Sequence, residues 1–174
     1  MSTRVRSIIQ LLAIGLIPFM PIAKLGAQGV KDNQRKQVAT QMKTIVLDSQ
    51  HYVFVPQMAI PMGLGSRQLS YGYRLVISKT KIESYLPYFG RAYMVDYGEN
   101  KSPLDFISTD FTYSIVNRKK GGWELRIEIK DVRDVRQLQL SIYENGSSTA
   151  QVICNNRQPI SFSGNIEPVK PTKE

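Results

Sequence analysis

Few residues in this chain are able to do covalent or metal chemistry. His51 is the only histidine and Cys154 the only cysteine, so a histidine metal cluster or a triad with a positioned imidazole has at most one candidate for each role. The sequence also contains no glycine-rich phosphate loop, cysteine pair or metalloprotease helix motif. We therefore predict no catalytic residue, no metal ligand and no cofactor. Cys154 is interpreted as a buried apolar residue, and an intermolecular disulfide is the alternative.

Carboxylates offer the remaining enzymatic chemistry. Asp96 and Glu99 lie close together in the sequence, and Asp105 and Asp110 flank Phe106. Two carboxylates at a suitable separation hydrolyse glycosides, whereas acids beside turns usually accept local hydrogen bonds. An enzyme, namely an envelope hydrolase acting on polysaccharide or lipid, is therefore the alternative to a binding function.

The strongest binding signal is the run from Ser84 to Tyr93, which combines aromatic residues with a proline, a glycine and an arginine. Pro87 disfavours helix at the residue before it, and Gly90 permits backbone conformations closed to other residues, so the run is predicted to bend. Exposed tyrosines suit sugar rings or a peptide, and Arg91 is able to grip a carboxylate or phosphate.

A second run, residues 155–166, has a similar composition. We hypothesise that the two runs converge in space, and that Arg91 and Arg157 form an anionic site if they share one edge. The alternative is a structural corner in which the aromatics plug the end of the sheet. The candidate ligand- or partner-binding residues are Tyr85, Tyr88, Phe89, Arg91, Tyr93, Asn156 and Arg157.

The elements that position these residues follow from hydrophobic periodicity. Val38, Met42, Ile45 and Val46 recur at helical spacing and predict a helix from about residue 30 to residue 47. After residue 50 the period changes to two. The alternating rows that predict strands are Leu69–Ile77, Phe111–Ile115, Trp123–Ile129 and Leu138–Ile142, with further strands at Tyr52–Val55 and Thr149–Cys154.

Short turns connect several of these strands. Asn145-Gly146 and Lys119-Lys120-Gly121-Gly122 have the composition of hairpin turns, which join antiparallel neighbours. The sequence thus predicts an α+β, mainly β fold, in which an N-terminal helix packs on a curved antiparallel sheet of about 6–8 strands. Periodicity leaves open whether the sheet closes into a barrel.

The N-terminus has the pattern of an export signal. Arg4 and Arg6 precede an apolar stretch from Ile8 to Met20, and small residues end at Ala27. We predict cleavage after Ala27 and an exported protein, periplasmic or secreted; a retained membrane anchor is the alternative. The expected division is a signal peptide at 1–27, a helix at 28–49, a β domain at 50–167 and a flexible tail at 168–174.

The two aromatic runs resemble those of the domain of unknown function 4251 family, a group of exported bacterial proteins. The similarity rests on Tyr85–Tyr93 and on Asn156–Gly164, and extends over nearly the whole chain after the signal. It implies a compact antiparallel β domain with an N-terminal helix, and it implies no activity. Many relatives look like lipoproteins, and the absence of a cysteine after the apolar stretch is a departure from them.

These observations favour a non-enzymatic exported binding domain of the cell envelope, with a purely structural accessory protein as a further alternative. The net charge is +9, which gives a weak preference for anionic partners, with ordinary solvated lysines as the alternative explanation. A glycan, a peptide or an anionic envelope component fits the aromatic run. We expect no nucleic acid partner, and no transmembrane segment once the signal is removed.

Overall fold

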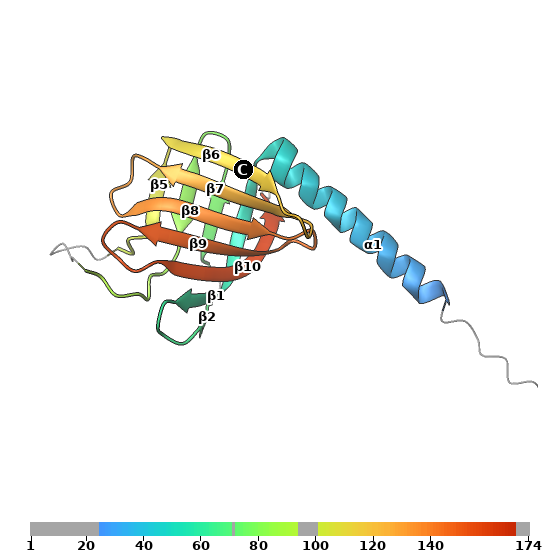
Figure 1. Ribbon diagram of the computed structural model, residues 1–174, viewed down its shortest axis with the longest axis horizontal. Coiled ribbons are helices and arrows are strands. Elements are labelled where there is room, and N and C mark those ends of the chain that lie inside the picture. The colour runs from blue at the N-terminus through green and yellow to red at the C-terminus, as the bar shows by residue number, and fades with distance from the viewer. Residues whose placement is uncertain (1–24, 71, 94–100, 170–174) are drawn as a thin grey trace, which may run out of the picture.

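The computed structural model describes residues 25–70, 72–93 and 101–169 (Figure 1). Most of the predicted signal peptide, the candidate acids Asp96 and Glu99, and the end of the predicted tail lie outside these residues. None of the helices in the described part of the chain is both long enough and apolar enough to cross a membrane.

In these described ranges one helix precedes ten strands. The helix α1 continues directly into a π-helical segment, η1, and every strand pairing is antiparallel. The elements are α1 (Leu25–Lys43), η1 (Thr44–Ser49), β1 (Tyr52–Pro61), β2 (Arg67–Gln68), β3 (Arg74–Ile77), β4 (Ile82–Tyr85), β5 (Asp105–Ser108), β6 (Phe111–Asn117), β7 (Trp123–Ile129), β8 (Val135–Ile142), β9 (Ser147–Cys154) and β10 (Ile160–Pro168).

The sheet curls into a nearly closed barrel. Its strand order is β5-β4-β3-β1-β10-β9-β8-β7-β6, and β2 pairs with β1. Strands β5 and β6 follow one another in the chain but form the two edges of the sheet, so the curl brings these edges close at the short turn that joins them (Figure 1). None of the described strand pairings joins β5 to β6, so the barrel stays open along β6. The predicted fold class is confirmed. The strand count exceeds the expected one because β2, β4 and β5 are too short for alternation to reveal them.

Alternation decides which side chains fill the barrel. On β7 the residues Trp123, Leu125, Ile127 and Ile129 are buried, and the residues between them are exposed. Tyr52 on β1 is fully buried, and its hydroxyl lies 3.4 Å from the hydroxyl of Tyr113 on β6. Burial raises the pKa of Tyr52 well above its usual value. The polar outer face and apolar interior follow from the period of two.

The predicted row from Leu69 to Ile77 is wrong as one continuous strand. The chain makes a turn at Gly72, which has a φ of 112°, and β3 begins only at Arg74. Backbone with this positive φ favours glycine, so the turn interrupts a sequence whose alternation otherwise fits a strand.

The helix docks by its C-terminal end and otherwise projects from the barrel (Figure 1). Met42, Ile45 and Val46 are buried, as their spacing predicted, whereas Val38 is 38% exposed. A groove of about 430 Å³ runs between the helix and the β8–β9 turn. The helix therefore covers one part of the sheet and leaves the ends of β4 and β9 uncovered.

One carboxylate joins the two sheet edges where β5 turns into β6. The side chain of Asp131 accepts hydrogen bonds from the Ser108 hydroxyl at 2.6 Å and from the backbone N–H groups of Thr109 and Asp110 at 2.8 and 3.1 Å. These donors, chiefly the Ser108 hydroxyl, lower the pKa of Asp131 to about 2. Asp131 thus stays charged and holds the turn.

Candidate binding site

The two aromatic runs meet at one end of the barrel, and their convergence is confirmed. An isolated β-bridge joins Ala92 to Arg157. The Tyr93 N–H donates to the Asn156 carbonyl at 2.9 Å, and the Gln158 N–H donates to the Arg91 carbonyl at 3.1 Å. We call this junction, residues 85–93 with 155–159, the aromatic corner. Main-chain contacts therefore position it.

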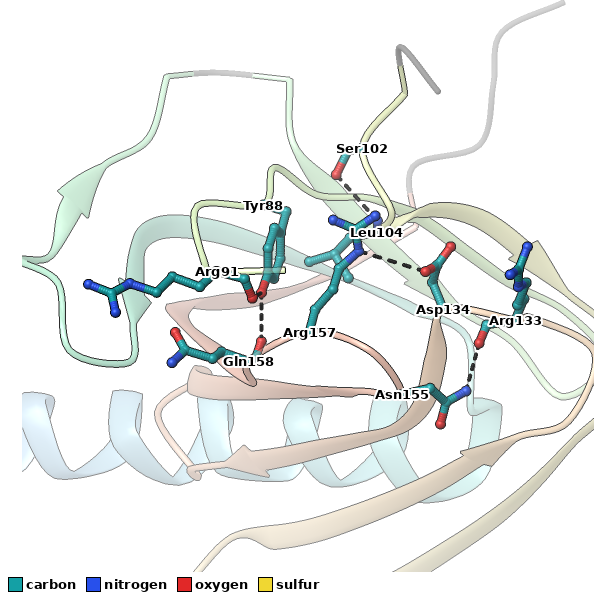
Figure 2. A network of polar contacts seen from close by, with 9 residues as sticks. All are labelled: Tyr88, Arg91, Ser102, Leu104, Arg133, Asp134, Asn155, Arg157 and Gln158. Atoms are coloured by element: carbon teal, nitrogen blue, oxygen red, sulfur yellow. Dashed lines mark hydrogen bonds and ion pairs between the residues drawn. The ribbon is translucent and has the colours of Figure 1, made fainter. Parts of the chain in front are cut away.

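Tyr88 points into the corner, with its hydroxyl between the two runs (Figure 2). Its hydroxyl lies 2.9 Å from the carbonyl oxygens of both Arg91 and Gln158, one on each run. Burial is the main reason that the pKa of Tyr88 rises to about 12, so at neutral pH the phenol keeps its proton and donates it to one carbonyl at a time. Tyr88 is therefore a cross-link between the runs.

Gly90 is required by the position of Tyr88. A Cβ atom at residue 90 would overlap the Tyr88 hydroxyl and ring. The glycine predicted to permit a bend thus also leaves the space that the folded-back tyrosine occupies.

Arg157 packs inside the same frame. Its side chain is 13% exposed, and its guanidinium carbon lies 5.6 Å from the centre of the Tyr88 ring. Its Nε lies 3.7 Å from Asp134 Oδ1 (Figure 2), beyond hydrogen-bond distance. Asn155 adds a further tie to the β7–β8 loop, because its side-chain amide donates to the Arg133 carbonyl at 2.6 Å. Arg157 is therefore held by the ring and the acid together.

Cys154 lies next to this frame and is buried. Burial raises its pKa to about 11, and the nearby Arg157 opposes only part of that rise, so the thiol stays protonated. His51 cannot assist it. Val152, two residues before Cys154, pairs with Ile160 at the start of β10, whereas Tyr52 pairs with Pro168 at its end. The histidine and the cysteine therefore lie at opposite ends of the barrel.

Three candidate residues face outward. Tyr85 is 50% exposed and Tyr93 70% exposed, and the Arg91 side chain extends away from Arg157 (Figure 2). The hypothesis that the two arginines form one anionic site is therefore wrong, because the bridge places their backbones side by side while their side chains diverge. Of these two arginines, only Arg91 has its side chain at the surface.

Two residues that sequence reasoning missed extend this outward surface. The Arg67 guanidinium lies 5.0 Å from the centre of the half-buried Phe89 ring, and the Tyr73 ring stacks on Tyr85 at 5.6 Å. Arg67 belongs to the short strand β2, which no pattern in the sequence indicated. Tyr73 lay in the predicted row, but its pairing with Tyr85 depends on how β3 meets β4.

The seven candidates thus divide into two groups. Tyr88, Asn156 and Arg157 form the internal frame, and Tyr85, Phe89, Arg91 and Tyr93 reach the surface. Asp134, which the sequence analysis did not identify, also belongs to the frame because it lies beside Arg157. The surface group combines aromatic rings with a cation, and it is able to contact a planar or anionic group.

A shallow hollow that Tyr85 also lines contains two carboxylates. It measures about 200 Å³ and lies over β3, β4 and β5, with Glu83 and Asp105 in its lining. Glu83 is paired with Lys81 at 2.6 Å and its side chain is 42% exposed. Within the described ranges no three histidine, cysteine, aspartate or glutamate residues gather as a metal site would require.

Comparison with known proteins identifies a family and a fold. The model of the family described as Domain of unknown function (DUF4251) matches residues 33–166. The fold is similar to that of the crystal structure of a DUF4251 family protein from Bacteroides eggerthii, with a TM-score of 0.54 and 13% sequence identity. That similarity covers 78% of this chain and 92% of the other. No curated protein matches the sequence.

Proposed function

We propose that this chain, which belongs to the DUF4251 family, is a non-enzymatic exported domain that binds an anionic component of the bacterial cell envelope. The binding surface is the outward side of the aromatic corner. One observation carries the proposal. Tyr88 and Arg157 are held in the internal frame of the corner, whereas Tyr93 and Arg91 face solvent.

The chemistry of the exposed group supports an anionic partner. Tyr85 and Tyr93 offer ring faces and hydroxyls for a sugar or a peptide, and the Arg91 guanidinium is able to form paired hydrogen bonds with a carboxylate or phosphate. Arg67 adds a second cation beside Phe89. Because the frame fixes the backbone of residues 91–93, little ordering of the loop is needed on binding.

The N-terminal pattern supports export. Arg4 and Arg6, the apolar stretch and the small residues that end at Ala27 match the three parts of a secretory signal. An export route would place the aromatic corner among envelope polysaccharides and lipids, where carboxylates and phosphates are abundant. Mass spectrometry of protein isolated from its native cells tests the expected N-terminus at Gln28.

Binding is tested by thermal shift and by calorimetry. The probes are oligosaccharides that carry uronic acids or phosphates, with neutral oligosaccharides of equal length beside them. We expect the acidic probes to raise the melting temperature, and Arg91→Ala and Tyr93→Ala to remove most of that rise. Lys79→Ala, an exposed cation in the β3–β4 turn, is the matched control.

The same experiment separates the alternatives. If Lys79→Ala loses as much of the rise in melting temperature as Arg91→Ala does, the interaction depends on net charge alone. This result would refute a site at the corner. Binding of neutral and acidic probes alike would refute the role of Arg91. Tyr88→Ala is unsuitable as a binding probe because Tyr88 holds the corner together.

The hollow on β3–β5 is the observation that favours the second candidate, an envelope hydrolase. Glu83 and Asp105 lie on adjacent strands, and the register pairs Glu83 with Ile107 and Tyr85 with Asp105. The two carboxylates are therefore diagonal neighbours on one face, about 7–8 Å apart at Cα level. Turnover of a chromogenic glycoside that Asp105→Asn abolishes would establish this function and displace the binding proposal.

A further inference from the structure

Strand β6 is a sheet edge without the usual protection against pairing. It is last in the strand order, and β7 is its only partner among the described strands. Its sequence, Phe-Thr-Tyr-Ser-Ile-Val-Asn, contains no charge, proline or glycine, although proteins commonly protect edges with lysine, proline, a bulge or short length. The opposite edge, β5, has only four residues and begins with an aspartate.

The register shows which backbone groups of β6 face the open edge. At its two ends, Lys130 N–H donates to the Asp110 carbonyl and Arg118 N–H donates to the Gly122 carbonyl, both at 3.0 Å. Both pairs continue the β6–β7 register. Because bonded and non-bonded pairs alternate along an antiparallel ladder, the even-numbered residues bond to β7. The odd-numbered residues direct their backbone N–H and C=O groups away from β7, toward the open edge of the sheet.

The side chains of this edge are also incompletely covered. Phe111, Tyr113 and Ile115 face the barrel interior but remain half-buried, and Val116 on the outer face is 61% exposed. An edge with free backbone groups, β-branched and aromatic residues and no charge is suited to adding another strand.

We infer that two copies of this chain associate through β6, in antiparallel orientation with Ser114 on the two-fold axis. In this register Tyr113 faces Ile115 of the second copy and Phe111 faces Asn117. All of these are odd-numbered positions, so the N–H and C=O groups that they direct toward the open edge bond to those of the second copy. On the outer face Thr112 covers Val116, a favourable pair of β-branched residues.

The charges that flank β6 select this arrangement. Asp110 precedes the strand and Arg118 follows it, so the antiparallel register places Asp110 of one copy opposite Arg118 of the other. The basic tip of Lys119 and Lys120 then lies beside the β5–β6 turn of the second copy, which contains Asp110 and is hydrogen-bonded to Asp131. Parallel pairing would instead place acids beside acids and bases beside bases.

Cross-linking tests the register directly. Ser114→Cys puts a thiol on the axis, where it faces its own copy at disulfide distance. Arg126→Cys is the matched control, because Arg126 is opposite Ser114 on β7 and is also exposed. Its copy would lie three strand spacings away, about 14 Å, which is too far for a disulfide. The wild-type protein, in which Cys154 is free and buried, gives the background level of cross-linking.

We expect mild oxidation to convert most of the Ser114→Cys protein to a covalent dimer and to leave the Arg126→Cys protein monomeric on non-reducing gels. Equal cross-linking of the two variants, or none in either, would overturn the inference. This outcome is independent of binding at the aromatic corner, which neither substitution touches.

Sedimentation velocity tests the association itself. The purified protein at tens of micromolar should sediment with twice the mass of one chain. Ser114→Lys places two ammonium groups together on the axis and should restore the mass of one chain, while Thr80→Lys, in the β3–β4 turn, should not. Both variants should melt near the wild-type temperature, since both sites are exposed. A monomeric wild type, or a dimer that Ser114→Lys leaves intact, would refute the pairing.

Discussion

The Tyr88 hydroxyl offers the most direct test of the corner as a frame. Tyr88→Phe keeps the ring against Arg157 but removes the donor that lies 2.9 Å from the carbonyls of Arg91 and Gln158. A neutral hydrogen bond of this kind contributes about 1 kcal/mol to the free energy of unfolding, within a range of roughly 0.5–1.5 kcal/mol. For a domain of this size, about 1 kcal/mol corresponds to a decrease of about 2–4 °C in melting temperature.

The assay is urea unfolding at pH 7, followed by fluorescence and circular dichroism, with a thermal melt beside it. Tyr93→Phe is the matched control, because Tyr93 belongs to the same run and is 70% exposed. Removal of a solvated hydroxyl should change the free energy of unfolding by less than about 0.5 kcal/mol. The urea midpoint should fall only for Tyr88→Phe, with an unchanged slope.

Hydrogen exchange adds a local measurement. If the hydroxyl holds the two runs together, the amides of Tyr93 and Gln158, which bond across the junction, should exchange faster in Tyr88→Phe than in the wild type. Equal midpoints for both variants, with unchanged exchange at these amides, would refute the assignment of Tyr88 to the frame and return it to the ligand-facing group.

Three further predictions follow from the same geometry. Gly90→Ala should melt below the wild type, because its Cβ would displace the Tyr88 hydroxyl. In a double-substitution cycle, Arg91→Ala and Arg157→Ala should have additive effects on the urea midpoint, since their side chains diverge; a clear coupling would contradict this. Asp131→Asn should lower stability near pH 7. Because folding lowers the Asp131 pKa from 3.8 to about 2, the wild-type advantage should be full above about pH 4 and should disappear as the pH falls through about 2 in melts recorded at stepped pH values.

The sequence predicted the regular elements well because their side chains alternate between two environments. The row from Trp123 to Ile129 became β7 with the predicted residues inside. The same rule failed for Leu69–Ile77, where local alternation continued across a turn at Gly72. Barrel closure was beyond the reach of periodicity, because it depends on sheet curvature and on the turn that Asp131 holds between the edges.

The candidate site could be located from the sequence but not divided into its parts. Composition identified both runs, since proline, glycine and aromatic residues together rarely form a plain strand. It could not show that Tyr88 points inward while Tyr93 points outward, because that depends on which carbonyls lie across the junction. Asp134 and Arg67 carry no local signal, and only the tertiary structure brings them to Arg157 and Phe89.

The division between frame and surface makes function separable from stability in this domain. The fold accounts for Tyr88, Gly90 and Arg157, because each fills or ties the junction. It does not account for Arg91 and Tyr93, whose side chains face solvent and whose truncation should cost the fold little. A variant of the first group alters both melting and any binding, whereas a variant of the second group should alter binding alone. A partner contact at the corner therefore has a signature that a purely structural corner cannot produce.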